Sequence, residues 1–197
     1  MSNLKLECGI FRDFGQDLLV KELKLFKKTL NDVGITFFLT CGTCLGFVRE
    51  GQFLEHDKDI DIGIFEDVDL EKLKKVLEAV YINVSIYGED NGKIVWANRE
   101  INGALLVFEI QVHYRKDGKI FMNRDLEEDA PQRYIEGRLE WSAKFFDNMK
   151  IIKHRGEEYL IPTFVEEYLY TAYGNWKIKE EWKDWRYNMR NIHEGWL

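Results

Sequence analysis

G-T-C-L-G-F-V-R-E-G-Q-F-L-E-H-D-K-D-I-D-I-G-I, the stretch Gly42–Ile64, decides how the rest of this chain is interpreted. Near its end, Asp57, Asp59 and Asp61 follow one another at a spacing of two, so a strand would place all three carboxylates on one face. Acidic residues are poor strand formers, and like charges on one face repel each other. Bound divalent cations are the expected compensation. The opposite face of this strand would be apolar and point into a core, because it carries Ile60, Ile62 and Ile64.

The acidic strand has the spacing of a metal site. Neighbouring residues on one face of a strand lie roughly 6.6–7 Å apart, so Asp59 and Asp61 can ligate two Mg²⁺ ions separated by about 3.5–4 Å. A third ligand has to come from another strand. Glu109 is the candidate, because a lone carboxylate in the apolar run A-L-L-V-F-E-I-Q-V-H-Y needs a partner. Oxygen ligands favour Mg²⁺ or Mn²⁺ over zinc.

A phosphate-binding turn is expected before the acidic strand. Gly42 and Thr43 would begin a short helix and offer backbone N–H groups and a hydroxyl to a phosphate. Arg49 and Lys58 carry positive charges that can bracket an anion. A D-x-D pattern alone is common on exposed strands, but a phosphate cradle followed by a metal-binding D-x-D indicates phosphoryl or nucleotidyl transfer.

Other reactive side chains allow alternative interpretations. Cys41 and Cys44 form a C-x-x-C pattern, which is typical of redox dithiols, but the chain has no second cysteine pair for a zinc site and the dithiol would leave the aspartates unexplained. We therefore interpret these cysteines as incidental. His56 and His113 either line the site or are structural histidines. The tryptophans near the C-terminus are interpreted as packing residues rather than as a platform for sugar stacking.

Composition limits the class of protein. The 197 residues, 45% of them hydrophobic, predict one domain or one domain with an extension. A net charge of −7 argues against a nucleic-acid partner. Three cysteines suit a reducing compartment, no stretch is apolar enough to span a membrane, and the first residues lack the apolar run of a signal peptide. These features predict a cytoplasmic protein.

Periodicity predicts a mixed α+β fold, with helices packed against a mixed or largely antiparallel sheet. Residues 1–125 would form the catalytic core, and residues 126–197 a helical, aromatic-rich extension packed on it. Residues 125–140 resist assignment, and Thr163 and Glu166 have the spacing of a capping box. Helices are expected at 11–31, 43–49, 69–80 and after Pro162, and strands at 35–40, 59–64, 82–87, 93–98, 104–114, around 120, 148–153 and 157–161.

Two blocks of this chain resemble the LicD/fukutin family. The stretch Gly42–Ile64 is similar to that family's G-T-L-L-G-x-x-R followed by D-x-D-I-D-I. The block I-P-T-F-V-E-E-Y-L-Y-T-A-Y-G-N-W, from Ile161 to Trp176, resembles its signature P-x-x-x-x-x-Y-L-x-x-x-Y-G. The two blocks frame most of the chain, from about Gly34 to Trp176, in the family's order.

This resemblance implies a nucleotidyltransferase fold related to polymerase β. It also implies Mg²⁺-dependent transfer of a phospho-substituent, of the phosphocholine or alditol-phosphate type, from a CDP-linked donor to a glycan hydroxyl, with release of CMP. Carried over by position, Gly42 and Thr43 would hold donor phosphate and Asp59 and Asp61 would hold metal, while Glu109, as third ligand or general base, stands where the family more often has Asp. The alternatives are transfer of the nucleotidyl group itself with release of pyrophosphate, and a catalytically silent binding module of the same fold.

Overall fold

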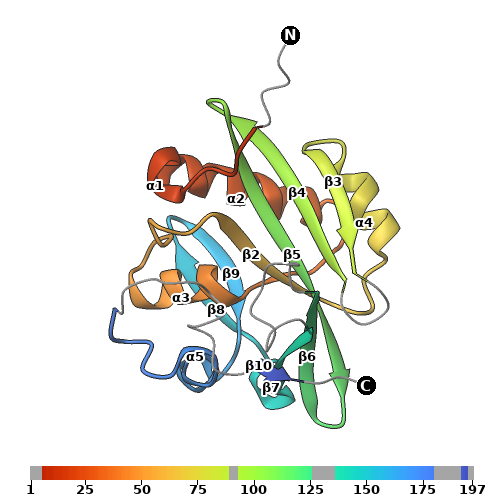
Figure 1. Cartoon of the computed structure of the whole chain (residues 1–197), viewed down its shortest axis with the longest axis vertical. Coiled ribbons are helices and arrows are strands. Elements are labelled where there is room, and N and C mark those ends of the chain that lie inside the picture. The colour runs from red at the N-terminus through yellow and green to blue at the C-terminus, as the bar shows by residue number, and fades with distance from the viewer. Residues whose placement is uncertain (1–5, 89–92, 126–135, 180–191, 195–197) are drawn as a thin grey trace.

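The structure is a computed structural model that describes residues 6–88, 93–125, 136–179 and 192–194 (Figure 1). Its helices are α1 (Phe11–Phe14), α2 (Gln16–Asn31), α3 (Cys41–Arg49), α4 (Leu70–Leu77), the 3₁₀ helix η2 (Ala143–Phe145) and α5 (Val165–Tyr173). Its strands are β1 (Phe38–Leu39), β2 (Asp59–Phe65), β3 (Ile82–Tyr87), β4 (Ile94–Ile101), β5 (Ala104–Lys116), β6 (Lys119–Asp125), β7 (Glu136–Ser142), β8 (Lys150–His154), β9 (Glu157–Ile161) and β10 (Ile192–Glu194).

The strands form one mixed sheet, as the α+β expectation required. Within the described residues, the order is β10-β7-β6-β5-β2-β1-β9-β8, and β4 and β3 continue from β5 on a separate branch. The pairs β2–β5 and β1–β9 are parallel, whereas the other pairs are antiparallel. The first part of the long strand β5 pairs with both β2 and β4, and its last three residues pair with β6 (Figure 1). This position places β5 beside the acidic strand.

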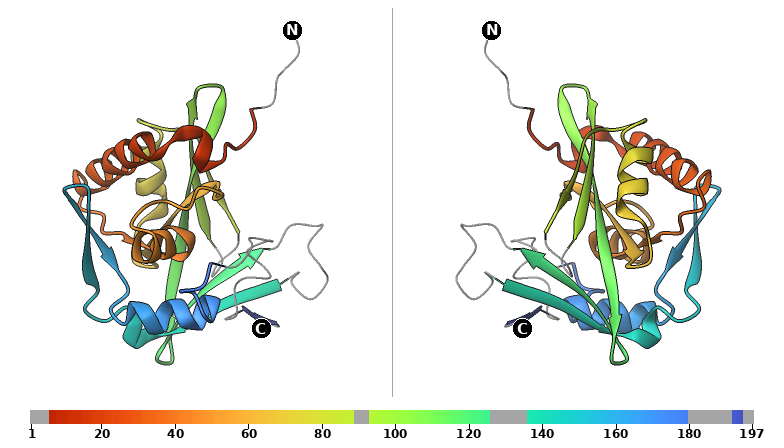
Figure 2. Two further views of the ribbon diagram at one scale, coloured as in Figure 1. Left: turned by 90° about the vertical axis from the view of Figure 1, so that its left-hand side faces the viewer. Right: turned by 90° about the vertical axis from the view of Figure 1, so that its right-hand side faces the viewer.

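One face of the central sheet is covered by α2 and α4 (Figures 1 and 2). The isoleucines of β2 that were expected in the core are all fully buried. On β5, Phe108 stacks on Phe26 of α2, with ring centroids 4.7 Å apart and planes only 8° from parallel. Because side chains alternate along a strand, burying this apolar set turns the carboxylates of β2 and β5 to the opposite face.

Two local predictions are corrected by the structure, and part of an unassigned region is assigned. The helix expected over 11–31 is broken at Gly15, whose φ of 77° cannot continue a right-handed helix. The capping box is absent, because the Thr163 hydroxyl instead donates to the carbonyl of Asp147 at 2.8 Å. The unassigned region contains β7, which pairs with β6. Between β5 and β6 the chain turns at Asp117-Gly118, with both residues at positive φ.

The C-terminal part of the chain contributes strands to the same sheet as the N-terminal part. Strand β9 pairs in parallel with β1, and β7 pairs with β6. The boundary at residues 125/126 stays a prediction. Trp182, Trp185 and Trp196 lie outside the described residues, whereas Trp176 is buried. None of the described helices is both long and apolar enough to cross a membrane.

Candidate active site

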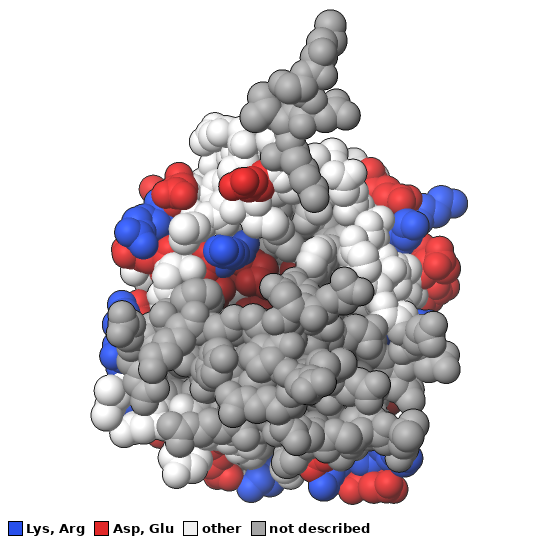
Figure 3. All heavy atoms as spheres, in the orientation of Figure 1, with Lys and Arg blue, Asp and Glu red and all other residues white. Residues whose placement is uncertain are grey.

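Three carboxylates from two strands converge on the face of the sheet opposite α2 and α4. Asp59 and Asp61 lie on β2, and the parallel register places Asp61 directly beside Glu109 of β5. Each residue offers an oxygen, and these oxygens all lie within 4.8 Å of one another. Figure 3 shows acidic side chains in a hollow of this surface, at the place where β2 and β5 lie in Figure 1. The structure therefore brings together the three residues that the sequence suggested as ligands.

Asp61 is held in place by the start of α3. The backbone N–H of Thr43 donates to Asp61 Oδ2 at 3.2 Å, and the backbone N–H of Asp61 donates to Thr43 Oγ1 at 2.8 Å. Both side chains are buried, with exposed fractions of 6% and 1%. The structure thus shows Thr43 orienting a carboxylate, while its predicted contact with donor phosphate stays a prediction.

Gln111 joins the carboxylates of both strands, a role that the sequence analysis did not assign to it. This fully buried residue donates from Nε2 to Asp61 Oδ1 at 3.0 Å and to Glu109 Oε1 at 2.7 Å. The Cys41 thiol donates to Gln111 Oε1 at 3.4 Å, which fixes the orientation of the amide. The available signal was its position two residues after Glu109, because residues at that spacing share a face of the strand.

Asp57 also belongs to this cluster, although it lies just before β2. Its carboxylate hydrogen-bonds with the Asp59 side chain and accepts from the backbone N–H of Lys58. Burial, together with the charge of Glu109, raises the pKa of Asp57 to about 6, although these hydrogen bonds oppose the shift. Gly42 makes this crowding possible, because a Cβ there would collide with Asp57 Oδ2 and lie 3.0 Å from Asp61 Oδ2.

The second sequence block supports the start of α3 from the far end of the chain. The Tyr168 hydroxyl of α5 lies 2.7 Å from Thr40 Oγ1 and accepts from the backbone N–H of Cys41 at 3.1 Å. Burial raises the pKa of Tyr168 well above its usual value, so the hydroxyl stays neutral. The two sequence blocks therefore meet at the turn between β1 and α3.

Arg49 and Lys58, the basic residues predicted to bind an anion, lie in surroundings that differ from each other. Arg49 ends α3, about 12 Å along the helix from Cys41. Its guanidinium pairs with Glu50 at 2.8 Å and donates to the carbonyl of Trp176 at 3.2 Å. Lys58 is exposed beside the acidic strand. The contacts that we predicted for these two residues with donor phosphate stay predictions.

His113, Cys41 and Cys44 have surroundings of a structural kind. His113 is fully buried against Phe38 and Trp141, and burial lowers its pKa to about 4. Cys41 and Cys44 are buried and do not form a disulfide. Burial, together with the charge of Asp61, raises the pKa of the Cys44 thiol far above its usual value, which disfavours the reactive thiolate.

The chemistry of the carboxylate cluster fits a hard divalent cation. Asp59, Asp61 and Glu109 supply only oxygen, which is the ligand type of Mg²⁺ and Mn²⁺. A fourth carboxylate, Asp57, has a raised pKa beside them, and a cation would relieve the repulsion that contributes to this shift. When bound, such an ion neutralises charge that develops on phosphate oxygens.

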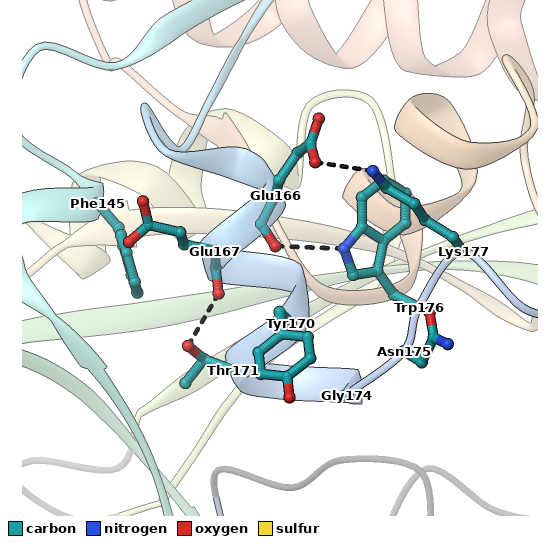
Figure 4. Close-up of a pocket in the computed structure, with 9 residues that line it drawn as sticks. All are labelled: Phe145, Glu166, Glu167, Tyr170, Thr171, Gly174, Asn175, Trp176 and Lys177. Carbon is teal, nitrogen blue, oxygen red and sulfur yellow. Dashed lines mark hydrogen bonds and ion pairs between the residues drawn. The ribbon is translucent and has the colours of Figure 1, made fainter.

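A separate pocket of about 480 Å³ lies along α5, away from the carboxylates (Figure 4). It is lined by Tyr170, which is 67% exposed, and by Trp176. The indole of Trp176 donates from Nε1 to the carbonyl of Glu166 at 3.2 Å and is largely buried. Trp176 is therefore a packing residue, as the sequence analysis favoured.

Residues 34–163 match the family described as LicD/FKTN/FKRP, nucleotidyltransferase domain. The chain belongs to this family. The match starts just before β1 and extends through β9, so it includes the whole carboxylate cluster. Family membership confirms the resemblance drawn from the two sequence blocks and the nucleotidyltransferase fold that it implied.

Among individual family members, the chain is similar to human "Ribitol-5-phosphate transferase FKTN", with 27% identity over 209 residues. That alignment covers 95% of this chain but only 38% of the human protein. The mouse protein of the same name is 43% identical over 60 residues, which cover 30% of this chain and 12% of the mouse protein. The chain thus spans about two fifths of the length of the human relative.

Among solved structures, the antibiotic-resistance factor ANT(2'')-Ia aligns with a TM-score of 0.41 and 14% sequence identity. The alignment covers 76% of this chain and 67% of that protein.

Proposed function

We propose that this LicD-family chain transfers a phospho-substituent from a CDP-linked donor to a hydroxyl of a glycan, with release of CMP. A substituent of the alditol-phosphate type, such as ribitol phosphate, is favoured over phosphocholine. The name of the human relative, a ribitol-5-phosphate transferase aligned over 95% of this chain, supports that preference. The proposed cofactor is Mg²⁺ or Mn²⁺, and the proposed location is cytoplasmic.

The observation that carries this proposal is the convergence of Asp59, Asp61 and Glu109 within 4.8 Å. In-line transfer of a phosphoryl group depends mainly on positioning and on neutralising negative charge, rather than on covalent chemistry by the protein. A rigid set of oxygen ligands that holds metal beside a bound diphosphate meets both needs. Glu109 is proposed as the third metal ligand, in place of the Asp that is more frequent in the family.

Two further residues, Thr43 and Gln111, orient these ligands. Thr43 fixes Asp61 from the start of α3, and Gln111 links Asp61 with Glu109 across two strands.

The backbone at Gly42 and Thr43 lies beside the cluster, and we propose that the donor phosphates bind there. Lys58 would add positive charge at the exposed edge, and Arg49 would contact the donor further along α3.

A panel of CDP-linked donors tests the proposal. Purified protein is incubated with CDP-ribitol, CDP-choline or CDP-glycerol and Mg²⁺, with and without a glycan acceptor, and CMP is quantified. We expect CMP from one donor in a reaction that EDTA abolishes and that added Mg²⁺ restores. Release of pyrophosphate from CTP, with the nucleotide appearing on the acceptor, would instead support nucleotidyl transfer. Failure to bind Mn²⁺ by calorimetry would support the silent binding module.

A further inference from the structure

An aromatic side chain stands beside the carboxylates on the next strand. In the antiparallel pair β4–β5, Trp96 is the direct partner of Glu109. Residues paired in this way point to the same side of the sheet, with Cβ atoms about 4.5–5.5 Å apart. The neighbours of Trp96 along β4, Val95 and Ala97, are fully buried on the helix side. Trp96 therefore lies on the carboxylate face and is adjacent to the proposed metal site.

The same face continues onto the edge strand β3. Ser85 is the partner of Trp96, and Tyr87 is the partner of Ile94, so both lie on the carboxylate side. Tyr87 is 51% exposed, and the centroid of its ring lies 5.1 Å from the ring centroid of Trp96. In Figure 1, β2, β5, β4 and β3 lie side by side, with α2 and α4 behind them. A surface with two aromatic rings thus extends outward from the carboxylates.

Among the residues that the structure describes, two polar atoms on this surface have no hydrogen-bond partner. They are Nε1 of Trp96, which can only donate, and Oδ1 of Asn98, which can only accept. Both atoms are shielded from solvent although their side chains are only half-buried. Asn98 lies two residues after Trp96 and shares its face, roughly 7 Å away. Unpaired shielded polar atoms cost free energy, and a ligand that supplies partners would remove that cost.

We propose that Trp96, Tyr87 and Asn98 form the subsite for the pyrimidine base of the donor nucleotide. The inference rests on the proposed function, because it needs a nucleotide whose phosphates lie at the carboxylates. Strands in a sheet are about 4.8 Å apart, and Tyr87 is also offset from Glu109 by two residues along the strand. Trp96 and Tyr87 therefore lie roughly 5 and 12 Å from Glu109 in the plane of the sheet. This separation matches the reach from the phosphates of a nucleotide to its base.

The chemistry of the subsite favours a pyrimidine base over a sugar. Aromatic side chains bind bases by stacking, and they do so on any flat π face. Cytosine has both a donor, its exocyclic amino group, and acceptors, its ring nitrogen and carbonyl. The Asn98 carbonyl oxygen can accept from the exocyclic amino group, while the Trp96 ring offers a face for stacking. Stacking supplies the affinity, and Asn98 positions the edge of the base.

Calorimetry with two ligands tests the subsite. CDP and inorganic pyrophosphate, each with Mg²⁺, are titrated into the wild-type chain and into Trp96→Ala, Trp96→Phe and Asn98→Ala. We expect Trp96→Ala to weaken CDP binding by about 5- to 150-fold. Pyrophosphate binding should change less than twofold, and Trp96→Phe should retain most of the affinity for CDP. Tyr170→Ala, which removes an exposed aromatic ring from α5, is the matched control and should bind both ligands normally.

A spectroscopic measurement on the wild-type protein covers the case in which Trp96→Ala fails to fold. The indole N–H resonance of Trp96, assigned by its loss in Trp96→Phe, should shift on addition of CDP and stay in place with pyrophosphate. CDP binding that is unchanged in Trp96→Ala, or an indole resonance that does not respond to CDP, would overturn the subsite alone. Equal weakening of CDP and pyrophosphate would also overturn it, since Trp96 would then only support the carboxylates. A wild-type protein that does not bind CDP would overturn the proposed function as well.

Discussion

Thr43 and Asp61 hold each other through two hydrogen bonds, in which each backbone N–H donates to the side chain of the other residue. The distances are 3.2 and 2.8 Å, and both residues are buried. This reciprocal pair joins the first turn of α3 to the acidic strand. The pair explains why a threonine follows Gly42, and this explanation does not require Thr43 to contact substrate.

The first prediction concerns this pair. Thr43→Val keeps the shape of the side chain but leaves the buried N–H of Asp61 without an acceptor, which should lower the free energy of unfolding by about 1–3 kcal/mol. Donor turnover should fall about 10- to 100-fold, because Asp61 keeps the bond from the Thr43 backbone N–H but loses the second of the two hydrogen bonds that fix its position. Urea unfolding and CMP release measure the two effects. Thr43→Ser keeps the hydroxyl and should retain most of the activity; equal loss in both variants would contradict this role.

The second prediction concerns Gln111. Gln111→Met preserves volume and removes the donor to Asp61 and Glu109, so affinity for Mn²⁺ should fall about 10- to 100-fold by calorimetry. Gln16→Met is the matched control, because Gln16 bonds only to the backbone of Phe53 in the described structure. It should lower stability without changing Mn²⁺ affinity. Unchanged Mn²⁺ binding in Gln111→Met would show that its amide does not position the ligands.

The third prediction concerns acid stability. The buried His113 is neutral in the folded protein because its pKa is lowered from 6.5 to about 4. An unfolded chain takes up a proton on this histidine near pH 6.5, whereas the folded chain does not until about pH 4. The resulting stability is fully present above pH 6.5 and is lost as the pH falls, by about 3 kcal/mol in total. His113→Phe should flatten the plot of unfolding free energy against pH in this window, and an unchanged slope would contradict the assignment.

The fourth prediction concerns the thiols. Under native conditions iodoacetamide should modify the exposed Cys8, while the buried Cys41 and Cys44 stay unmodified, and turnover should be unaffected. Mass spectrometry counts the adducts, and denatured protein should give three. Native alkylation of Cys41 or Cys44 at the rate of Cys8 would reopen the redox interpretation of the C-x-x-C pattern.

Alternation along β2 was the part of the site that the sequence could predict. The isoleucines face the core and the aspartates face away from it, because one buried face fixes the side on which every residue of a strand lies. The sequence also indicated that Glu109 needs a partner, since a lone carboxylate in an apolar strand demands one, and the structure places it beside Asp61.

Contacts between distant segments could not be predicted. Tyr168 reaches Thr40 across 128 positions, and no local pattern encodes that hydrogen bond. Gln111 was passed over because an amide in a strand is ordinary until the register places it between two carboxylates. Asp57 was not named among the metal ligands, and the close approach of Gly42 reveals how near it lies to the cluster. Gly15 interrupts a helical pattern that periodicity alone would continue.

Turnover by Asp59→Asn tests the central claim most directly, namely that the carboxylates of β2 and β5 form the metal centre of a CDP-dependent transferase. CMP release from the preferred CDP-linked donor is measured for the wild type, Asp59→Asn and Asp61→Asn, with circular dichroism as the check on folding. Asp59 is the cleaner position, because Asp61 also joins β2 to α3 and β5 through its bonds to Thr43 and Gln111. We predict Mg²⁺-dependent release by the wild type and background release by both folded variants. Turnover at the wild-type rate in either variant would contradict the account.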